Sequence, residues 1–263
     1  SHGVSFLATY TWSHALDDAS DAAGNFSGVG DRNQALIPFI AEFTNSVFDI
    51  RNRFTINSNY ELPLGKGRAF LNSSRWEDEV IGGWSTSLTY AAQTGTPFSV
   101  TPNNSTAAGG GTTEAFLVSN PYKAGGSPNS TNPDITCAAT TRTKANWYNP
   151  CAFANPLDGN LIAPGTVVTG EQEAIAFLGG RENTIYGPGY YQVNMSLFKN
   201  FATWREQNLQ FRADAFNVLN HPTLGTPSTN NDNSNGGNIT GPKTFQNNTP
   251  DSRFFQLALK YVF

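Results

Sequence analysis

The sequence predicts an all-β fold, an antiparallel meander of about six long strands joined by connections of very unequal length. Aromatic residues make up 13% of the 263 residues, whereas charged residues make up only 14%, well below the roughly 25% of an ordinary soluble domain. Six segments also alternate between apolar and polar residues with a period of two, which is typical of strands with two different faces. These segments are residues 3–13, 53–62, 83–92, 190–201, 208–217 and 253–263.

The first three segments each place aromatic and aliphatic side chains on one face. Ser, Thr and Asn dominate the opposite face, which also carries Arg53 and Glu61 in the second segment. The apolar sets are Val4, Phe6, Ala8, Tyr10 and Trp12, then Phe54, Ile56, Tyr60 and Leu62, then Trp84, Leu88 and Tyr90.

The last three segments repeat this arrangement. Their polar faces carry Arg212, Asp214 and Lys260 in mid-segment, beside Gln, Asn and Ser. The apolar sets are Tyr191, Val193, Met195 and Leu197, then Leu209, Phe211, Ala213 and Ala215, then Phe255, Leu257, Leu259, Tyr261 and Phe263.

The length of the segments indicates strands that cross a membrane. A tilted strand needs about 9–11 residues to cross a bilayer, whereas strands of globular proteins average about 5–6. Aromatic residues gather at the segment ends, such as Trp12 and Tyr190, as in the aromatic girdles of transmembrane barrels. The alternative is a soluble secreted β-domain that binds glycans or acts as an adhesin, with these aromatic residues in its core.

The connections between the segments indicate how the strands are oriented. Residues 14–52, 93–189 and 221–252 form long connections, whereas 63–82 and 202–207 are shorter. Transmembrane barrels have long loops outside and short turns on the periplasmic side. We therefore expect 93–189 to be a large extracellular loop with a small structure of its own, seeded by the apolar residues at 167–168 and 174–178.

Six strands are too few to close a transmembrane barrel. Such barrels begin at about 8 strands, and outer-membrane transporters have about 22. An open edge in lipid leaves backbone groups without hydrogen bonds. The sequence begins with Ser1, and its single methionine is Met195. We therefore expect the six transmembrane strands to be a partial segment of a 22-stranded outer-membrane β-barrel.

The two cysteines lie in the same long connection. Cys137 and Cys151 are an even pair within one loop, which favours a disulfide formed in an oxidising compartment. Two free thiols are the alternative. A zinc site is not expected, because His2, His14 and His221 are remote in sequence.

Several short motifs resemble one known family. Their order along the chain matches the C-terminal barrel of TonB-dependent receptors of the Oar-like kind, which often have a carboxypeptidase-regulatory-like domain. One departure is Asn52, which stands where the family usually has His. The motifs are YTWSHALDD at 10–18, FDIRNRF at 48–54, GGW at 82–84, QTGTPF at 93–98, NTIYGPG at 183–189, LFKNF at 197–201 and FRADAFNVLNHP at 211–222.

The resemblance implies an outer-membrane transporter of a Gram-negative-type bacterium. Such a receptor takes up a siderophore, an oligosaccharide or a peptide, with energy from the TonB complex. Its plug domain, which contacts TonB, is not in this sequence. Its other partners are outer-membrane lipid and the barrel-assembly machinery, for which Tyr261 and Phe263 match the C-terminal signal. The resemblance implies no enzyme activity and no cofactor.

The candidate site residues are charges on the polar faces. We expect Arg53, Glu61, Arg212, Asp214 and Lys260 to face the barrel lumen as a polar network, because burial of a charge without a partner is unfavourable. Solute-contacting residues are not identified.

Other site classes find little support in the sequence. Asp17, Asp18, Asp21 and Asp31 lack calcium-loop spacing, which favours a solvated acidic loop over a metal site. No nucleophile–base pair indicates catalysis. With 16 Lys and Arg against 20 Asp and Glu, a nucleic-acid partner is not expected.

Overall fold

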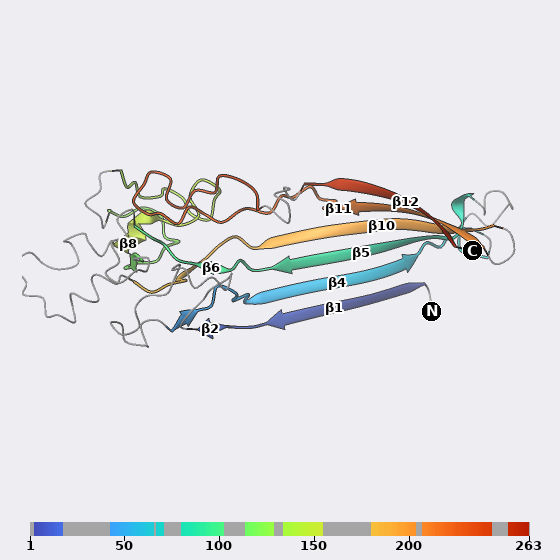
Figure 1. Cartoon of the computed structure of the whole chain (residues 1–263), viewed down its shortest axis with the longest axis horizontal. Coiled ribbons are helices and arrows are strands. Elements are labelled where there is room, and N and C mark those ends of the chain that lie inside the picture. The colour runs from blue at the N-terminus through green and yellow to red at the C-terminus, as the bar shows by residue number, and fades with distance from the viewer. Residues whose placement is uncertain are drawn as a thin grey trace, which may run out of the picture.

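The fold is dominated by one antiparallel sheet of six long strands, seen in the computed structural model of the chain (Figure 1). The structure describes residues 3–17, 43–65, 67–70, 80–102, 114–128, 134–154, 180–203, 207–243 and 252–262. The spatial order β1-β4-β5-β10-β11-β12 follows the chain, so the sheet is a meander, as predicted. The strands are β1 (Val4–Trp12), β4 (Asn52–Glu61), β5 (Trp84–Gln93), β10 (Tyr190–Ala202), β11 (Asn208–Phe216) and β12 (Phe254–Val262). Each agrees with its predicted range to within one residue at either end.

The register of the strands gathers polar side chains on one face of the sheet. Paired residues of neighbouring strands share a face, so one row across the sheet runs Ser5, Asn59, Ser87, Ser196 and Asp214. We call this side the polar face.

We call the opposite side of the sheet the apolar face. Successive side chains along each strand point to the polar and the apolar face in turn. A row on this side runs Ala8, Ile56, Tyr90 and Val193. The period-two pattern of the sequence is therefore a property of the whole sheet and not only of single strands.

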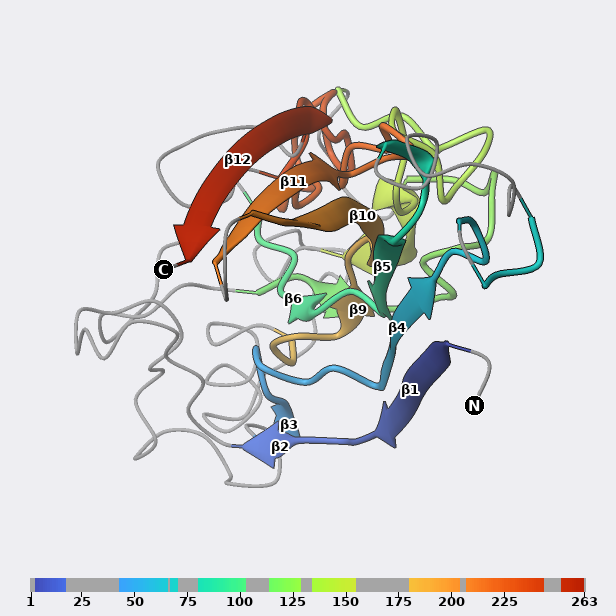
Figure 2. The same cartoon turned by 90° about the vertical axis from the view of Figure 1, so that its right-hand side faces the viewer.

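The sheet is curved and open, with β1 and β12 at its two edges (Figure 2). Large apolar side chains are exposed on the edge strands, among them Phe6 at 73%, and Phe255 and Leu257 at 71% each. Soluble proteins rarely expose a continuous apolar surface of this kind. This arrangement is that of a partial transmembrane barrel, as the sequence predicts.

The described parts of the three long connections lie at one end of the sheet, which we call the loop end (Figure 1). The described parts of the shorter β4–β5 and β10–β11 connections lie at the opposite end. In an antiparallel meander successive connections fall at alternate ends of the sheet. No helix in the described part of the chain is long and apolar enough to span a membrane. The loop end contains the strand pairs β2 (Leu16–Asp17) with β3 (Thr44–Asn45), β6 (Pro97–Phe98) with β9 (Ile185–Tyr186), and β7 (Phe116–Leu117) with β8 (Phe153–Ala154), and the 3-10 helix η1 (Pro150–Ala152).

The loop end has a hydrophobic core of its own. Tyr148, Phe153, Ile185 and Ile239 are each at most 1% exposed, and the Tyr148 ring lies edge-on to Phe153 with centroids 5.4 Å apart. Ile239 belongs to the third long connection, so this core joins two loops and is not formed by 93–189 alone. The expected apolar seeds at 167–168 and 174–178 lie outside the described residues.

A disulfide closes part of this core, as the sequence predicts. Cys137 and Cys151 are bonded with their Cα atoms 5.2 Å apart. Cys151 is 4% exposed and lies in η1, where the Asn149 side chain accepts a hydrogen bond from its backbone N–H at 3.1 Å. The bond therefore holds residue 137 against the most buried part of the loop end.

We predict that Phe153→Ala opens the loop core, because it removes a ring packed against Tyr148. Such a truncation costs about 3–5 kcal/mol, which raises the open population by about a hundredfold or more. Leu117→Ala is the matched control, since Leu117 is paired with Phe153 in β7–β8 but is 40% exposed. Limited proteolysis of the protein in detergent, with cleavage sites mapped by mass spectrometry, measures the difference. Equal cleavage rates for the two variants would contradict the assignment of the core.

Candidate functional site

The charged residues predicted from the sequence all lie on the polar face, and two of them are in contact. The Arg212 Nε donates hydrogen bonds to both Asp214 carboxylate oxygens, at 2.8 and 3.0 Å. Its Nη2 donates to Ser196 Oγ on the neighbouring strand at 3.3 Å. The Asp214 side chain is only 12% exposed, whereas that of Arg212 is 49% exposed. The ion pair lies within β11, and the hydrogen bond to Ser196 of β10 helps to fix the direction of the guanidinium.

The structure does not bring the other three predicted charges together with this pair. Glu61 accepts a hydrogen bond from Arg68 Nη2 at 3.0 Å, at the end of the sheet opposite to the loop end. Arg53 lies at the other end of the same strand, paired with Gln93, and Lys260 is paired with Gln210. Among the described residues the only ion pair within this set is Arg212–Asp214. The polar face therefore carries separate charged groups.

Two other predicted features are only partly described. The Tyr261 hydroxyl donates a hydrogen bond to Gln207 Oε1, while Phe263 lies outside the described residues. Asp17 belongs to β2, but Asp18, Asp21 and Asp31 also lie outside them. Within the described ranges no group of three or more His, Cys, Asp or Glu side chains is placed to hold a metal ion.

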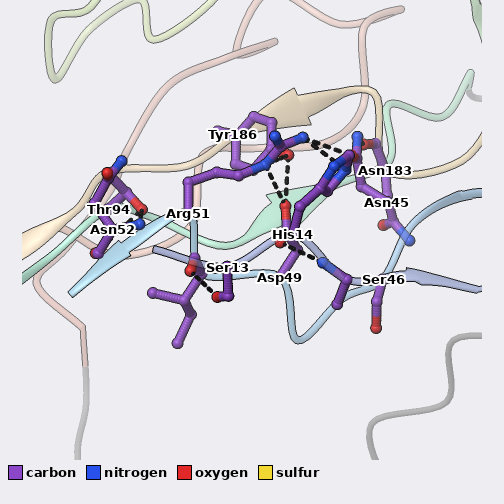
Figure 3. Close-up of polar contacts among 12 residues, drawn as sticks. Ser13, His14, Asn45, Ser46, Asp49, Arg51, Asn52, Thr94, Asn183 and Tyr186 are labelled. Atoms are coloured by element: carbon purple, nitrogen blue, oxygen red, sulfur yellow. Dashed lines mark hydrogen bonds and ion pairs between the residues drawn. The ribbon is translucent and has the colours of Figure 1, made fainter. Parts of the chain in front are cut away.

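Asp49, a fully buried charge at the loop end, was not predicted from the sequence as a site residue (Figure 3). The Asp49 side chain is 0% exposed. Its carboxylate accepts hydrogen bonds from Arg51 Nε at 2.7 Å, from the Tyr186 hydroxyl at 2.7 Å and from the Ala15 N–H at 2.8 Å. Burial alone raises the pKa of this carboxyl, but the hydrogen bonds from Ala15, Tyr186 and Arg51 outweigh it and hold the pKa below the ordinary value.

Arg51 extends this cluster to two further connections. Its Nη2 contacts His14 Nε2 at 2.8 Å and donates to Asn45 Oδ1 at 3.2 Å. The Asn45 amide donates in turn to the Asn183 carbonyl at 2.9 Å. The segments 13–17, 43–51 and 180–186 are thus joined around one ion pair whose carboxylate is fully buried. We call Asp49, Arg51, Tyr186, His14 and Asn45 the loop clamp.

Close backbone contact fastens the end of β5 to the segment before β10. A Cβ added at Gly95 would lie 2.0 Å from the Gly187 carbonyl oxygen, and one at Gly189 would lie 2.4 Å from the Gln93 carbonyl oxygen. Neither distance is compatible with a side chain. The glycines of the QTGTPF and NTIYGPG motifs therefore allow the two chain segments to touch.

Two pockets adjoin this junction, and both are lined by Gln93, Gly95 and Gly187. One, of about 310 Å³, includes Gln93 and Tyr190 of the polar face together with Phe98, Thr223 and Lys243. The other, of about 590 Å³, includes Phe54 and Ala92 of the apolar face. The loop clamp residues Arg51 and Tyr186 line the second pocket.

Signals for the loop clamp were present in the sequence. His14 lies in the motif at 10–18, Asp49 and Arg51 in that at 48–54, and Tyr186 in that at 183–189. Strand periodicity gives no information on residues beyond the strand ends. The motifs could therefore be matched to a family from the sequence, but their contact with one another in space could not be predicted. Their meeting at one point is new information from the structure.

Comparison with known proteins identifies a family. A family model described as "Outer membrane beta barrel domain" matches residues 1–256. No curated protein matches the sequence, and no solved structure matches it. The match covers five strands of the sheet in full and the first three residues of β12.

We predict that Gly95→Ala displaces the segment before β10, because its Cβ would overlap the Gly187 carbonyl. Gly241→Ala is the matched control, since a Cβ at Gly241 meets no atom within 4 Å. Hydrogen exchange of the Gly187 N–H, which donates to the Thr96 carbonyl at 2.9 Å, measures the displacement. We expect exchange to be at least tenfold faster in Gly95→Ala than in Gly241→Ala. Unchanged protection in both variants would contradict the proposed close contact.

We predict that Asp49→Asn loosens the loop clamp at neutral pH, because Arg51 loses the carboxylate with which it pairs. The loss of this charged hydrogen bond costs about 1–3 kcal/mol of stability. Since folding lowers the Asp49 pKa, its stabilisation is present above the unfolded carboxyl pKa, about 3.9, and is lost as pH falls through the folded value. Exchange of the Ala15 N–H, corrected for its intrinsic rate, should show this acid-dependent loss in the unaltered protein and not in Asp49→Asn. Asp134→Asn, at an exposed site, should behave as the unaltered protein. The same acid response in all three proteins would contradict the role of Asp49.

Proposed function

Since the chain belongs to the outer membrane β-barrel domain family, we propose that it forms part of the barrel of a TonB-dependent receptor. This receptor takes up a solute across the outer membrane with energy delivered through TonB. The motifs at 10–18, 48–54, 93–98, 183–189, 197–201 and 211–222 support the TonB-dependent class, because they occur in the order typical of Oar-like receptors.

One observation carries the proposal, namely the separation of the sheet into a polar and an apolar face. The apolar face, with residues such as Ile56, Tyr90 and Val193 in register, meets lipid. The polar face, with Arg212, Asp214 and Ser196, lines a lumen wide enough to hold water and protein. Small barrels fill their interior with packed side chains, whereas wide ones have a polar interior.

The two bare edges imply further strands. Both β1 and β12 are paired on one side only, and unpaired backbone groups within lipid cost several kcal/mol each. In the proposed receptor the other strands of a barrel of about 22 strands complete the pairing. A plug domain fills the lumen against the polar face and contacts TonB on the periplasmic side.

The loop end is the proposed solute-facing side. Its hydrophobic core and loop clamp give the described parts of the long connections a fixed shape. A preformed surface loses little conformational entropy on binding, which favours a role in ligand capture. The pocket with Gln93, Tyr190, Phe98 and Lys243 opens from the polar face and is the proposed first contact for the solute. Its mixture of aromatic, amide and amine groups suits a siderophore, an oligosaccharide or a peptide. The barrel performs no catalysis in this proposal and needs no cofactor.

The soluble secreted β-domain is not favoured as an alternative. The family places the protein in the outer membrane, and the exposed apolar face would make a detergent-free monomer aggregate. The barrel-assembly machinery is the partner proposed for insertion, with Tyr261 and Phe263 at the C-terminal strand as its signal.

We predict that uptake of at least one scarce solute requires both this protein and TonB. Cells with the gene, without it, and without TonB are compared on limiting ferric siderophores, oligosaccharides and peptides, with labelled solute followed over time. Lys243→Gln, which removes a charge from the polar-face pocket, should weaken uptake by several-fold. Lys123→Gln, exposed elsewhere at the loop end, is the control.

The uptake experiment distinguishes the transport classes. Loss of uptake in both the deletion and the TonB-free strain supports an energy-coupled receptor. Uptake that needs this protein but continues without TonB would make it a passive porin, and undiminished uptake in the deletion strain for every solute class would overturn a role in transport.

A further inference from the structure

The pocket of about 590 Å³ lies at the loop end of the sheet, where its lining includes residues of the apolar face and Gln93 at the end of β5. Phe54 and Ala92, which line it, belong to the same row of the apolar face as Tyr10 and Tyr191. Arg142 and Trp147 of the long connection line the pocket as well. One wall is therefore continuous with the lipid-facing surface, and another carries polar groups from the loop end.

Arg142 has an unusual backbone for a residue with a side chain. Its φ is 61°, in the left-handed region that few residues other than glycine adopt. Its N–H donates to the Trp147 carbonyl at 3.1 Å. Such strained positions cost of order 1 kcal/mol or more and are found preferentially at binding sites.

The strained turn places the guanidinium between two aromatic rings. The Arg142 Cζ lies 3.5 Å from the Tyr122 ring centroid and 5.3 Å from that of Trp147. A guanidinium stacked on aromatic faces keeps its N–H groups available at its edge while its planar face is covered. The arrangement therefore suits a bidentate contact with an anionic group.

The aromatic platform is itself fixed by hydrogen bonds. Trp147 Nε1 donates to the Tyr186 carbonyl at 2.7 Å, and the Tyr122 hydroxyl donates to the same carbonyl at 3.3 Å. Thr141 Oγ1 donates to the Tyr122 carbonyl at 2.6 Å. A ligand would find the guanidinium already positioned, so little order has to be gained on binding.

The pocket carries net positive charge. Arg51 also lines it, but its charge is balanced by Asp49 at 2.7 Å. Arg142 forms no ion pair with a carboxylate anywhere in the described ranges of the chain. An anionic group at the rim and an apolar group against Phe54 would complement the two walls.

We propose that this pocket binds the phosphate-bearing headgroup of an outer-leaflet lipid, with Arg142 as the phosphate ligand and Phe54 and Ala92 against the acyl chain. The lipid source is favoured over a free anion because Phe54 and Ala92 of the apolar face line the pocket, next to the surface along which acyl chains lie. The inference rests on the proposed orientation, with the loop end outward, but not on transport, so the uptake experiment can fail while lipid binding holds.

The test uses the intact protein purified in an uncharged maltoside detergent. Its probes are a short-chain phosphatidic acid, a phosphatidylcholine with the same chains, and inorganic phosphate, with Kd measured for each. Arg142→Asn is the main variant, because asparagine tolerates a positive φ and removes the charge. Arg142→Lys keeps the charge but loses the bidentate fork. Arg253→Ala, an exposed arginine at the same end of the sheet, is the matched control.

We expect phosphatidic acid to bind the unaltered protein at least tenfold more tightly than phosphatidylcholine. Arg142→Asn should abolish this preference, Arg142→Lys should retain part of it, and Arg253→Ala should leave it intact. Inorganic phosphate binding as tightly as phosphatidic acid would instead indicate a site for soluble anions and overturn the proposal. If the unaltered protein bound the two lipids equally tightly, that result alone would overturn the proposal, whatever the variants showed.

Discussion

The structure depends on the requirement that every backbone N–H and C=O within lipid has a hydrogen-bond partner in the protein. Six long strands paired in sequence order satisfy this requirement everywhere except at the outer sides of β1 and β12. Pairing with a constant register then keeps each side chain on its own face across all the strands. Together with the period-two alternation of the sequence, this pairing gives the sheet one apolar and one polar face.

Beyond the strand ends the constraint changes, because the chain there is exposed to water and needs a core of its own. The aromatic cluster around Tyr148 and the Cys137–Cys151 bond supply that core. The loop clamp around Asp49 joins it to the strands through buried hydrogen bonds. These hydrogen bonds thus join the loop end to the ends of the strands.

The sheet was predictable from the sequence because alternation with a period of two leaves only one arrangement of faces. Residues such as Arg212 and Asp214 were therefore placed correctly on the polar face. The separation of Arg53 from Glu61 follows from their places at opposite ends of one strand. The other contacts among charged residues were not predictable, since strand periodicity fixes a face but neither the strand order nor the register that places Lys260 opposite Gln210. Asp49 and Arg142 escaped notice because each owes its position to loop geometry, in the second case to a positive φ at an arginine.

The central claim, that one face of the sheet meets lipid and the other a polar lumen, is tested most directly by placing the same charge on either face. Leu88 and Thr89 are neighbours in the middle of β5, on the apolar and the polar face. A lysine facing lipid near the bilayer midplane costs about 2–4 kcal/mol. The folded fraction in the outer membrane, measured by heat-modifiable mobility, should fall strongly for Leu88→Lys and remain near normal for Thr89→Lys. Equal loss for both substitutions, or a larger loss for Thr89→Lys, would contradict the assignment of the faces.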